Sequence, residues 1–160
     1  MRRKDREVTD MGRIIAILDQ ARIVHLGLID GEAPYVVPLH YGYKMEEGKL
    51  TLYMHGAREG HKIDLIRANP NAFIEIDCNE KLIAGGDLAC SYGSAYASIM
   101  GRGKACLLED DAEKAQALMI LMKSQTGRDF EISEKMARAV AVIRVDVESY
   151  SAKERQMPAE

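Results

Sequence analysis

Three strand-like runs follow one another between residues 22 and 55, and they constrain the fold more than any other feature of the sequence. The runs are Arg22–Ile29, Tyr35–Tyr43 and Lys49–His55, and turns at Asp30-Gly31 and Glu46-Glu47-Gly48 separate them. Strands joined by such short turns pair antiparallel, because a parallel pair needs a long crossover. The sequence therefore predicts an antiparallel meander in this region.

Helices and further strands flank the meander. Residues 10–20 carry apolar side chains at helical spacing behind the favoured N-cap residue Asp10, and Asn69-Pro70 ends a short helix over His61–Ala68. Residues 79–94 contain turn-forming residues without periodicity, so we predict a long exposed loop there. The other predicted elements are the strands Ala72–Cys78, Tyr96–Leu108 and Val140–Val147 and a helix over 110–123.

This order of elements lacks the strict strand-helix-strand alternation of a parallel sheet. It is typical of a mainly β (α+β) fold. We expect the sheet to close into a small antiparallel barrel with flanking helices, because closure removes exposed strand edges. Gly101 and Gly103 lie in the strand that follows the predicted loop, and they favour a bulge or a sharp bend.

Length and composition fit a single soluble domain. Of the 160 residues, 47% are hydrophobic and 29% are charged, and we expect one domain over 1–150 with a polar, frayed tail over 151–160. The net charge of −3 and the scattered basic residues argue against a nucleic-acid partner. No run approaches the roughly 18 apolar residues of a membrane helix, and the start lacks the apolar stretch of a signal peptide. We therefore expect a cytoplasmic protein without a membrane partner.

Neither the cysteines nor the histidines predict a metal site. Cys78, Cys90 and Cys106 are widely spaced, which indicates reduced thiols rather than a disulfide framework or a CxxC site. The histidines form no compact ligand motif, although residues distant in sequence can still converge. His25 is interpreted as a structural histidine within a strand, and the other three are His40, His55 and His61. No GxSxG motif supports hydrolase chemistry.

The densest local candidate for a binding site is the strand-to-helix turn His55–Lys62. It contains two glycines and several basic side chains. Free backbone N–H groups at the helix start, together with the lysine, form a natural cradle for a phosphate. The alternative interpretation is a solvated turn decorated with charges, and spacing alone does not decide between the two.

A second candidate is one face of the fifth predicted strand. Tyr96, Ser98, Met100 and Arg102 alternate onto this face, where the hydroxyl groups and the guanidinium can contact a polar ligand. The outward polar face of an amphipathic strand has the same pattern, so this alternative also stays open.

Several stretches together resemble one known family over almost the whole chain. They are Pro34–Leu39, Leu52–Ile66 and Asn69-Pro70, with the opening Met1–Glu7, a weaker match at Tyr96–Ala105 and the ending Ser149–Glu154. In these motifs the chain is similar to the pyridoxamine 5'-phosphate oxidase-like FMN-binding split-barrel superfamily, in its nitroimidazole-resistance (Nim)-related branch.

The resemblance implies a six-stranded antiparallel split β-barrel that forms a homodimer with one FMN in each of two grooves at the interface. It also implies which segments bind the cofactor: the second strand along the flavin ring, the end of the third strand against the flavin, the helix start at the phosphate, and the fifth strand. In this chain the residues that match the second strand are Val37, Pro38, Leu39 and His40, and those that match the end of the third strand are His55 and Gly56. His61 and Lys62 match the helix start. Ser98 matches the fifth strand, and Tyr96 is on the same face of it.

The chain departs from the family pattern at three places. Nim-like chains commonly have Tyr-Arg-Ser in the fifth strand, where this chain has Ala97, and the glycine of their closing Thr-Gly-Lys is Ala152 here. The C-terminal tryptophan and arginine of pyridoxamine-phosphate oxidases have no match, since the chain contains no Trp. The absence of this tryptophan and arginine disfavours oxidation of vitamin B6.

Three hypotheses for function follow from the resemblance. The first is an FMN-dependent oxidoreductase that reduces small nitroaromatic molecules such as 5-nitroimidazoles, with His55 as a proton donor or positioning residue, because imidazole titrates near neutral pH. The second is a flavin-binding module without turnover. The third is a barrel that holds haem or a deazaflavin in the same groove. The sequence has no GxGxxG unit after a strand, so a nicotinamide donor would bind without a Rossmann site.

Overall fold

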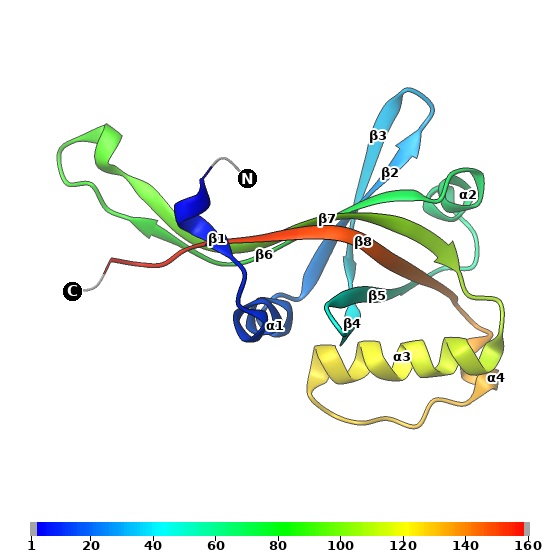
Figure 1. Cartoon of the computed structure of the whole chain (residues 1–160). Coiled ribbons are helices and arrows are strands. Elements are labelled where there is room, and N and C mark those ends of the chain that lie inside the picture. Colours follow the sequence, from blue (N-terminus) through cyan, green and yellow to red (C-terminus); the bar gives the residue numbers. More distant parts are fainter. Residues whose placement is uncertain (1–2, 159–160) are drawn as a thin grey trace.

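The computed structural model describes residues 3–158, which form one antiparallel sheet of eight strands. The strand order is β3-β2-β6-β7-β8-β5-β4, and β1 also pairs with β8 (Figure 1). The strands are β1 (Glu7–Val8), β2 (Ile23–Asp30), β3 (Ala33–His40), β4 (Gly42–Glu46), β5 (Lys49–Gly56), β6 (Asn71–Ile83), β7 (Gly93–Leu107) and β8 (Ala141–Arg155).

Helices flank this sheet. The α-helices are α1 (Met11–Gln20), α2 (His61–Ala68), α3 (Asp111–Thr126) and α4 (Glu134–Ala137), and the short 3-10 turns are η1 (Lys4–Arg6) and η2 (Ala89–Ser91). None of the helices in the described part of the chain has the length and apolar character that a membrane span requires. The predicted mainly β order with flanking helices is confirmed.

The six predicted strands and three predicted helices are all present, but the predicted strand Tyr35–Tyr43 is divided at Tyr41. This residue is buried, and its hydroxyl donates to Leu18 O at 2.8 Å, so the chain is drawn toward α1 where β3 ends and β4 begins. The sequence does not predict β1 or α4, because two and four residues are too few to show a period.

Alternating side chains of the central strands build the main core. In β2, Val24, Leu26 and Leu28 point inward and are buried. Burying each such side chain contributes about 1.5–3 kcal/mol relative to leaving it in water. They belong to a cluster that includes residues of β5, β6, β7 and the apolar face of α1: Leu50, Leu52, Met54, Ile74, Ile76, Ile99, Ile14, Ile17 and Leu18. The alternate residues of these strands therefore point to the opposite face of the sheet.

Signals at the helix ends and in the long strand are confirmed. Asp10 caps α1 by accepting from Arg13 N at 2.8 Å, and α2 ends at Ala68, before Asn69-Pro70. The register of β7 against β8 shifts between Arg102 and Gly103, which is the predicted bulge.

The prediction of a long exposed loop over 79–94 holds only for residues 84–92, because β6 runs on to Ile83 and β7 begins at Gly93. Strands β6 and β7 continue into this region and form a hairpin, here called the β6–β7 arm, that projects from the sheet (Figure 1). The register shifts between Cys78 and Lys81, where Asn79 has a φ of 61°. This irregularity breaks the alternation of side chains, so the sequence shows no strand period there. The arm exposes the large apolar side chains of Leu82, Leu88 and Tyr92.

The prediction of a frayed tail over 151–160 is wrong for residues 151–155, because these residues form the last part of β8. Ala152 is buried, and the Glu154 carboxylate accepts two hydrogen bonds from the Arg13 guanidinium of α1, that from Nε at 2.9 Å. This contact lowers the pKa of Glu154. The β-branched run that predicts the strand ends at Val147, whereas pairing with β7 continues beyond it. Residues 159–160 lie outside the described residues.

We predict that Gly42→Ala destabilises the fold by pushing α3 away from β4. A Cβ atom at Gly42 would lie 2.5 Å from Leu121 Cα and 2.8 Å from the Ile120 carbonyl carbon, both in helix backbone. We expect a loss of about 1–3 kcal/mol in the free energy of unfolding, measured with urea. Gly27→Ala is the matched control, because its Cβ would meet Phe73 O at an ordinary 3.4 Å. Equal losses in both variants would contradict this role of Gly42.

Candidate functional site

The strand-to-helix turn after β5 leaves backbone donors free at the start of α2. Gly60 is the N-cap, with a φ of 133° and a ψ of 166°, a conformation that essentially only glycine adopts. The first bonds of the helix run from Ile63 N and Asp64 N to Gly60 O, at 2.8 and 3.2 Å. Within residues 3–158, the N–H groups of His61 and Lys62 have no acceptor. They lie at the positive end of the helix dipole, where an anion is favoured.

The Lys62 side chain lies across Gly56 and adds a cation to these donors. A Cβ atom on Gly56 would be 2.9 Å from Lys62 Cε and 3.1 Å from Nζ, so the glycine leaves the room that the lysine occupies. In the described chain no carboxylate lies within 4.0 Å of the Lys62 ammonium, and Asp64 in the same turn pairs with Arg67 at 3.8 Å. The turn therefore combines an unpaired ammonium with free N–H groups, which is a donor set that suits a phosphate.

The His61 imidazole ties α2 to the hairpin formed by β2 and β3. Its Nε2 lies 2.6 Å from Asp30 Oδ2, and its ring packs edge-on against Tyr35, with ring centroids 5.2 Å apart. Because the side chain is engaged in this way, the backbone N–H is the part of His61 that can serve a ligand.

The four predicted residues of β3 are divided between two faces. Val37 and Leu39 are half-buried and pack against the core, whereas Pro38 and His40 are exposed on the outer face. His40 Nδ1 lies 3.1 Å from Arg22 O. Since β3 ends the sheet, its outer edge has no strand partner in the described chain and offers backbone groups to a ligand.

His55 stands at the end of β5, next to the glycine that Lys62 covers. Its side chain is exposed and shares a face with Thr51 and Tyr53, as the alternation predicts. It is opposite Val142 of β8 in the register. The structure thus brings His55, Gly56, His61 and Lys62 together in one turn.

Tyr96 and Ser98 do not join this turn. Ser98 pairs with Asp77 and Lys153. By contrast, β7 reaches the level of Met54, the neighbour of His55 in β5, only at Leu107, since both are opposite Ile143 of β8. Nine residues separate Ser98 from Leu107, which is about 30 Å along an extended strand. In a single chain, the predicted contacts from β7 are therefore remote from the predicted phosphate cradle.

Tyr96 lies instead next to Arg6 of η1 and pairs with Arg155 at the end of β8. Figure 1 shows this N-terminal segment on the opposite side of the molecule from α2. Its hydroxyl accepts from Arg6 Nη1 at 3.5 Å, and Lys153 Nζ lies 5.5 Å from its ring centroid. Burial alone would raise the pKa of the Tyr96 hydroxyl, but the neighbouring Lys153 and Arg6 cations outweigh it, and the pKa is lowered.

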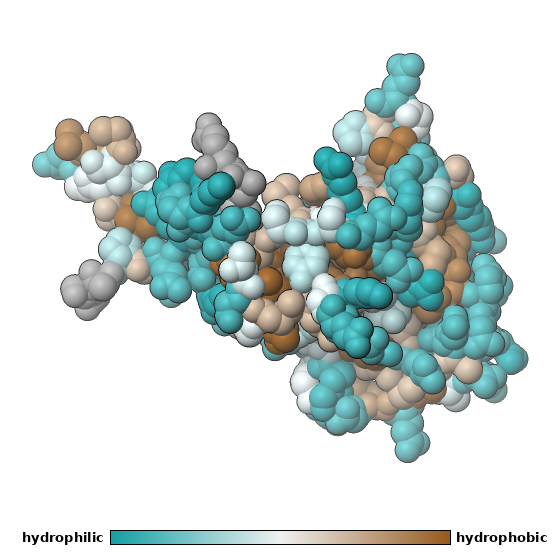
Figure 2. Space-filling view, in the orientation of Figure 1, coloured by the Kyte–Doolittle hydropathy of each residue, from teal (hydrophilic) through white to brown (hydrophobic). Residues whose placement is uncertain are grey.

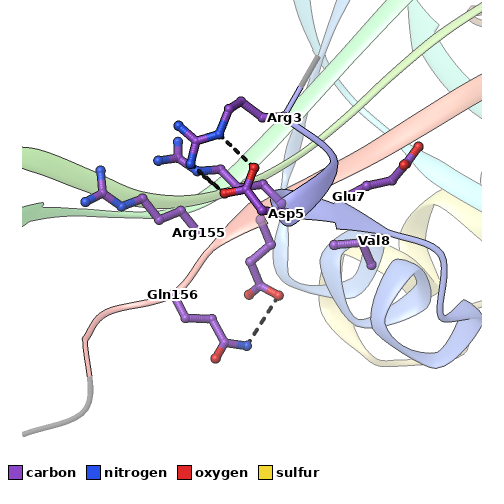
Figure 3. A pocket seen from close by; sticks show the side chains of 8 residues that line it. Arg3, Asp5, Glu7, Val8, Arg155 and Gln156 are labelled. Atoms are coloured by element: carbon purple, nitrogen blue, oxygen red, sulfur yellow. Dashed lines mark hydrogen bonds and ion pairs between the residues drawn. The ribbon is translucent and has the colours of Figure 1, made fainter. Parts of the chain in front are cut away.

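A charged hollow of about 470 Å³ adjoins this region, between η1, β1 and the end of β8. Figure 3 shows Arg3, just before η1, and Asp5 of η1 turned toward each other, with Arg155 at the end of β8 and Gln156 directly after it. Three basic residues line the hollow, and three acidic ones balance them: Arg3, Arg6 and Arg155 against Asp5, Glu7 and Glu154. This balance argues against a strong anion site here.

The sequence analysis missed two contacts between distant residues. Glu154, in the family-like ending of the chain, holds Arg13 of α1, and His25 is paired with Glu75 across β2 and β6. The separations of 141 and 50 residues explain why no local motif reveals either contact. The contact between His25 and Glu75 could have been predicted only from the register of β2 against β6.

The sequence profile of the pyridoxamine 5'-phosphate oxidase family matches residues 10–154. This chain belongs to that family. Among curated proteins no match was found.

Solved structures support the same assignment. A candidate 5-nitroimidazole antibiotic resistance protein from Bacteroides thetaiotaomicron is 36% identical, with 92% of this chain and 86% of that chain covered and a TM-score of 0.77. An FAD and haem binding protein from Mycobacterium smegmatis (16% identity, 97% and 76% covered, TM-score 0.78) and an FAD-binding protein from Mesorhizobium loti (22%, 94% and 98%, 0.65) share the fold. The predicted split-barrel fold and the resemblance to the nitroimidazole-resistance branch are confirmed.

Proposed function

We propose that this chain is an FMN-dependent oxidoreductase that reduces small nitroaromatic compounds. The observation that carries the proposal is the turn at Gly56–Lys62, with two free N–H groups and an unpaired ammonium. Its support from the comparisons is family membership and 36% identity to a candidate 5-nitroimidazole resistance protein. A bound flavin supplies the redox chemistry that no side chain can provide.

FMN fits the donor set better than FAD does. The Lys62 ammonium and the N–H groups of His61 and Lys62 belong to one short turn, and this donor set suits one terminal phosphate carrying up to two negative charges. The open edge of β3 would orient the ring through backbone groups near Pro38. His55, at the end of β5, would hold a proton close to the substrate.

We also propose that the functional unit is a homodimer, because one chain separates Ser98 and Tyr96 from the phosphate cradle. On the outer face of β2, β3, β6 and β7, the exposed apolar side chains of Ile29, Val36 and Phe73 line a hollow of about 510 Å³. Met100 of β7 is exposed on the same face. The tip of the β6–β7 arm is also apolar (Figure 2). Two apolar surfaces on one chain suit an isologous partner, which would add the partner's Ser98 and the partner's Tyr96 to the site.

We predict that Met100→Lys converts the dimer to a monomer and releases the flavin, because a charge would enter the apolar interface. Light scattering coupled to size exclusion, with flavin absorbance recorded, measures both effects. Met136→Lys is the matched control, because Met136 of α4 is also exposed but lies outside the outer face. An unmutated protein that is monomeric with flavin bound would contradict the homodimer.

Lys62→Ala is expected to weaken FMN about ten- to a hundred-fold while leaving riboflavin affinity nearly unchanged. A charge-assisted contact to the phosphate is worth about 1.5–3 kcal/mol, and riboflavin has no phosphate. Fluorescence titration of both ligands gives the two dissociation constants. Arg58→Ala removes an exposed cation from the same turn and serves as the control for general electrostatics. Equal losses for FMN and riboflavin would mean that Lys62 does not bind the phosphate.

The His55→Gln variant distinguishes the hypothesis of an enzyme from that of a flavin-binding module without turnover. If His55 delivers a proton to the substrate, the variant keeps its flavin and loses about a hundred-fold or more in turnover. The measurement is single-turnover reduction of a 5-nitroimidazole by protein whose flavin has been reduced beforehand, at saturating FMN and across pH 5–8. Matching rates and pH profiles would remove His55 from the chemistry. A rate no higher than that of free flavin in the unmutated protein would refute the nitroreductase function and leave a flavin-binding module.

A further inference from the structure

A hollow of about 300 Å³ lies at the base of the β6–β7 arm, and its volume is at the lower end of the range for small-molecule sites. We call it the arm-base hollow, and its lining includes Arg13, Lys81, Tyr96, Glu154 and Arg155. We propose that it binds the 2′-phosphate of a phosphorylated nicotinamide dinucleotide, the electron donor of the flavin. This inference rests on the proposed oxidoreductase function and adds the source of its electrons.

The strand register places the arm-base hollow on the α1 side of the sheet, opposite to the proposed dimer surface. Lys81 of β6 is opposite Ala95 of β7, and Glu154 of β8 is opposite Ala97. Ala95 and Ala97 are both buried, and Glu154 contacts Arg13 of α1, so these side chains point toward α1. The outer face consists of the alternate residues of the same strands. A partner that covers the outer face therefore leaves this hollow open.

The charges that line the arm-base hollow are unbalanced in favour of cations. The basic residues are Arg13, Lys81 and Arg155, and the only acidic one is Glu154, which is already paired with Arg13. Within residues 3–158, Lys81 and Arg155 form no ion pair. The larger charged hollow on the other side of Arg155 differs, because acidic and basic residues are equal in number there. An anion in the arm-base hollow would thus meet two free cations.

The Arg155 guanidinium is held in place by the backbone of the arm. A Cβ atom on Gly93 would lie 3.0 Å from Arg155 Cζ and 3.0 Å from Nη2, so the glycine leaves the space that the guanidinium occupies. Arg155 is half-buried, and Figure 3 shows its side chain extended away from the pair formed by Arg3 and Asp5. A guanidinium that is already positioned loses little freedom on binding, and its planar fork of N–H donors matches a phosphate.

This cation set favours a 2′-phosphate over a phosphate diester. One guanidinium fork and one ammonium can neutralise a phosphomonoester with up to two negative charges. In dinucleotide sites of other folds, an arginine likewise accommodates the 2′-phosphate.

Tyr96 connects the arm-base hollow with the proposed flavin site. It lines the hollow, and in the proposed homodimer it reaches the partner's flavin. A dinucleotide held by its phosphate in the hollow can therefore extend its nicotinamide toward that flavin. The reduced nicotinamide gives a hydride, which is two electrons and one proton, to the oxidised flavin and leaves in its oxidised form.

The binding test titrates the full-length chain, at saturating FMN, with 2′,5′-ADP in a calorimeter. This nucleotide is the part of the donor that carries the 2′-phosphate, and we expect it to bind at least about tenfold more tightly than 5′-AMP, which lacks that group. Lys81→Ala and Arg155→Ala should each weaken 2′,5′-ADP about ten- to a hundred-fold, because each removes one charge-assisted contact. Lys135→Ala, which removes an exposed lysine from α4, is the matched control and should bind as the unmutated chain does.

Reduction of the bound flavin by NADPH, followed by the loss of flavin absorbance, gives a second readout. The Lys81→Ala and Arg155→Ala variants should need at least about tenfold more NADPH to reach half of the maximal rate, while the maximal rate itself is nearly unchanged. The concentration of NADH that gives half of its maximal rate should not change, because NADH has no 2′-phosphate.

Three outcomes would overturn the donor site: no saturable binding of 2′,5′-ADP, equal affinities in the two variants and the unmutated chain, or binding that only Lys62→Ala removes. The last would place the nucleotide at the phosphate cradle of the flavin. Thermal melting checks that each variant is folded. Reduction of a 5-nitroimidazole by protein whose flavin has been reduced chemically needs no donor, so failure of the proposed function and failure of the donor site can be told apart.

Discussion

The pairing of β7 with β8 is the constraint on which the rest of the structure depends. Each strand has 15 residues, and they pair from Tyr96 opposite Arg155 to Leu107 opposite Ile143. β6 pairs with the free edge of β7, while β5 and β1 pair with β8. The two halves of the sheet are joined only through this ladder in the described chain. A Cβ at Gly103 would lie 2.3 Å from Asp146 O, so the bulge that bends the ladder requires glycine.

This ladder also decides which parts of the candidate site can meet. The turn that holds Lys62 follows β5, which pairs with the early part of β8, whereas Ser98 pairs with the late part of β8. The two groups of predicted cofactor residues therefore belong to opposite ends of one long strand. The proposed homodimer would bring both groups to one ring-sized site, and the exposed apolar side chains of the outer face and the arm are the surface proposed for it.

Features set by a few neighbouring residues could be predicted from the sequence. The cap at Asp10, the helix end at Asn69-Pro70 and the bulge next to Gly103 each depend on local chemistry, and all are present. The turn at His55–Lys62 is also local, which is why its donors could be anticipated. The β6–β7 arm could not, because the irregularity after Cys78 hides the alternation that marks a strand.

Contacts that depend on strand register could not be predicted from the sequence for a different reason. His25 looks like a structural histidine in isolation, and only the pairing of β2 with β6 places Glu75 opposite it. The same holds for Arg13 and Glu154, whose contact joins the first helix to the last strand. In both cases the residue types are ordinary, and the information lies in which strand is the neighbour.

The link between α2 and the β2–β3 hairpin has a consequence for cooperativity. Asp30 and Tyr35 hold the His61 ring, while the backbone of the same helical turn presents the free N–H groups. A phosphate bound at this turn, as proposed, would also order the hairpin, and by reciprocity a well-ordered hairpin would tighten the binding of the phosphate. Residues near the tip of the β2–β3 hairpin would thus influence the affinity of the turn for a phosphate without contacting it. Substitutions at Asp30 or Tyr35 could therefore change the affinity for a phosphate during evolution, while every residue that contacts the phosphate stays the same.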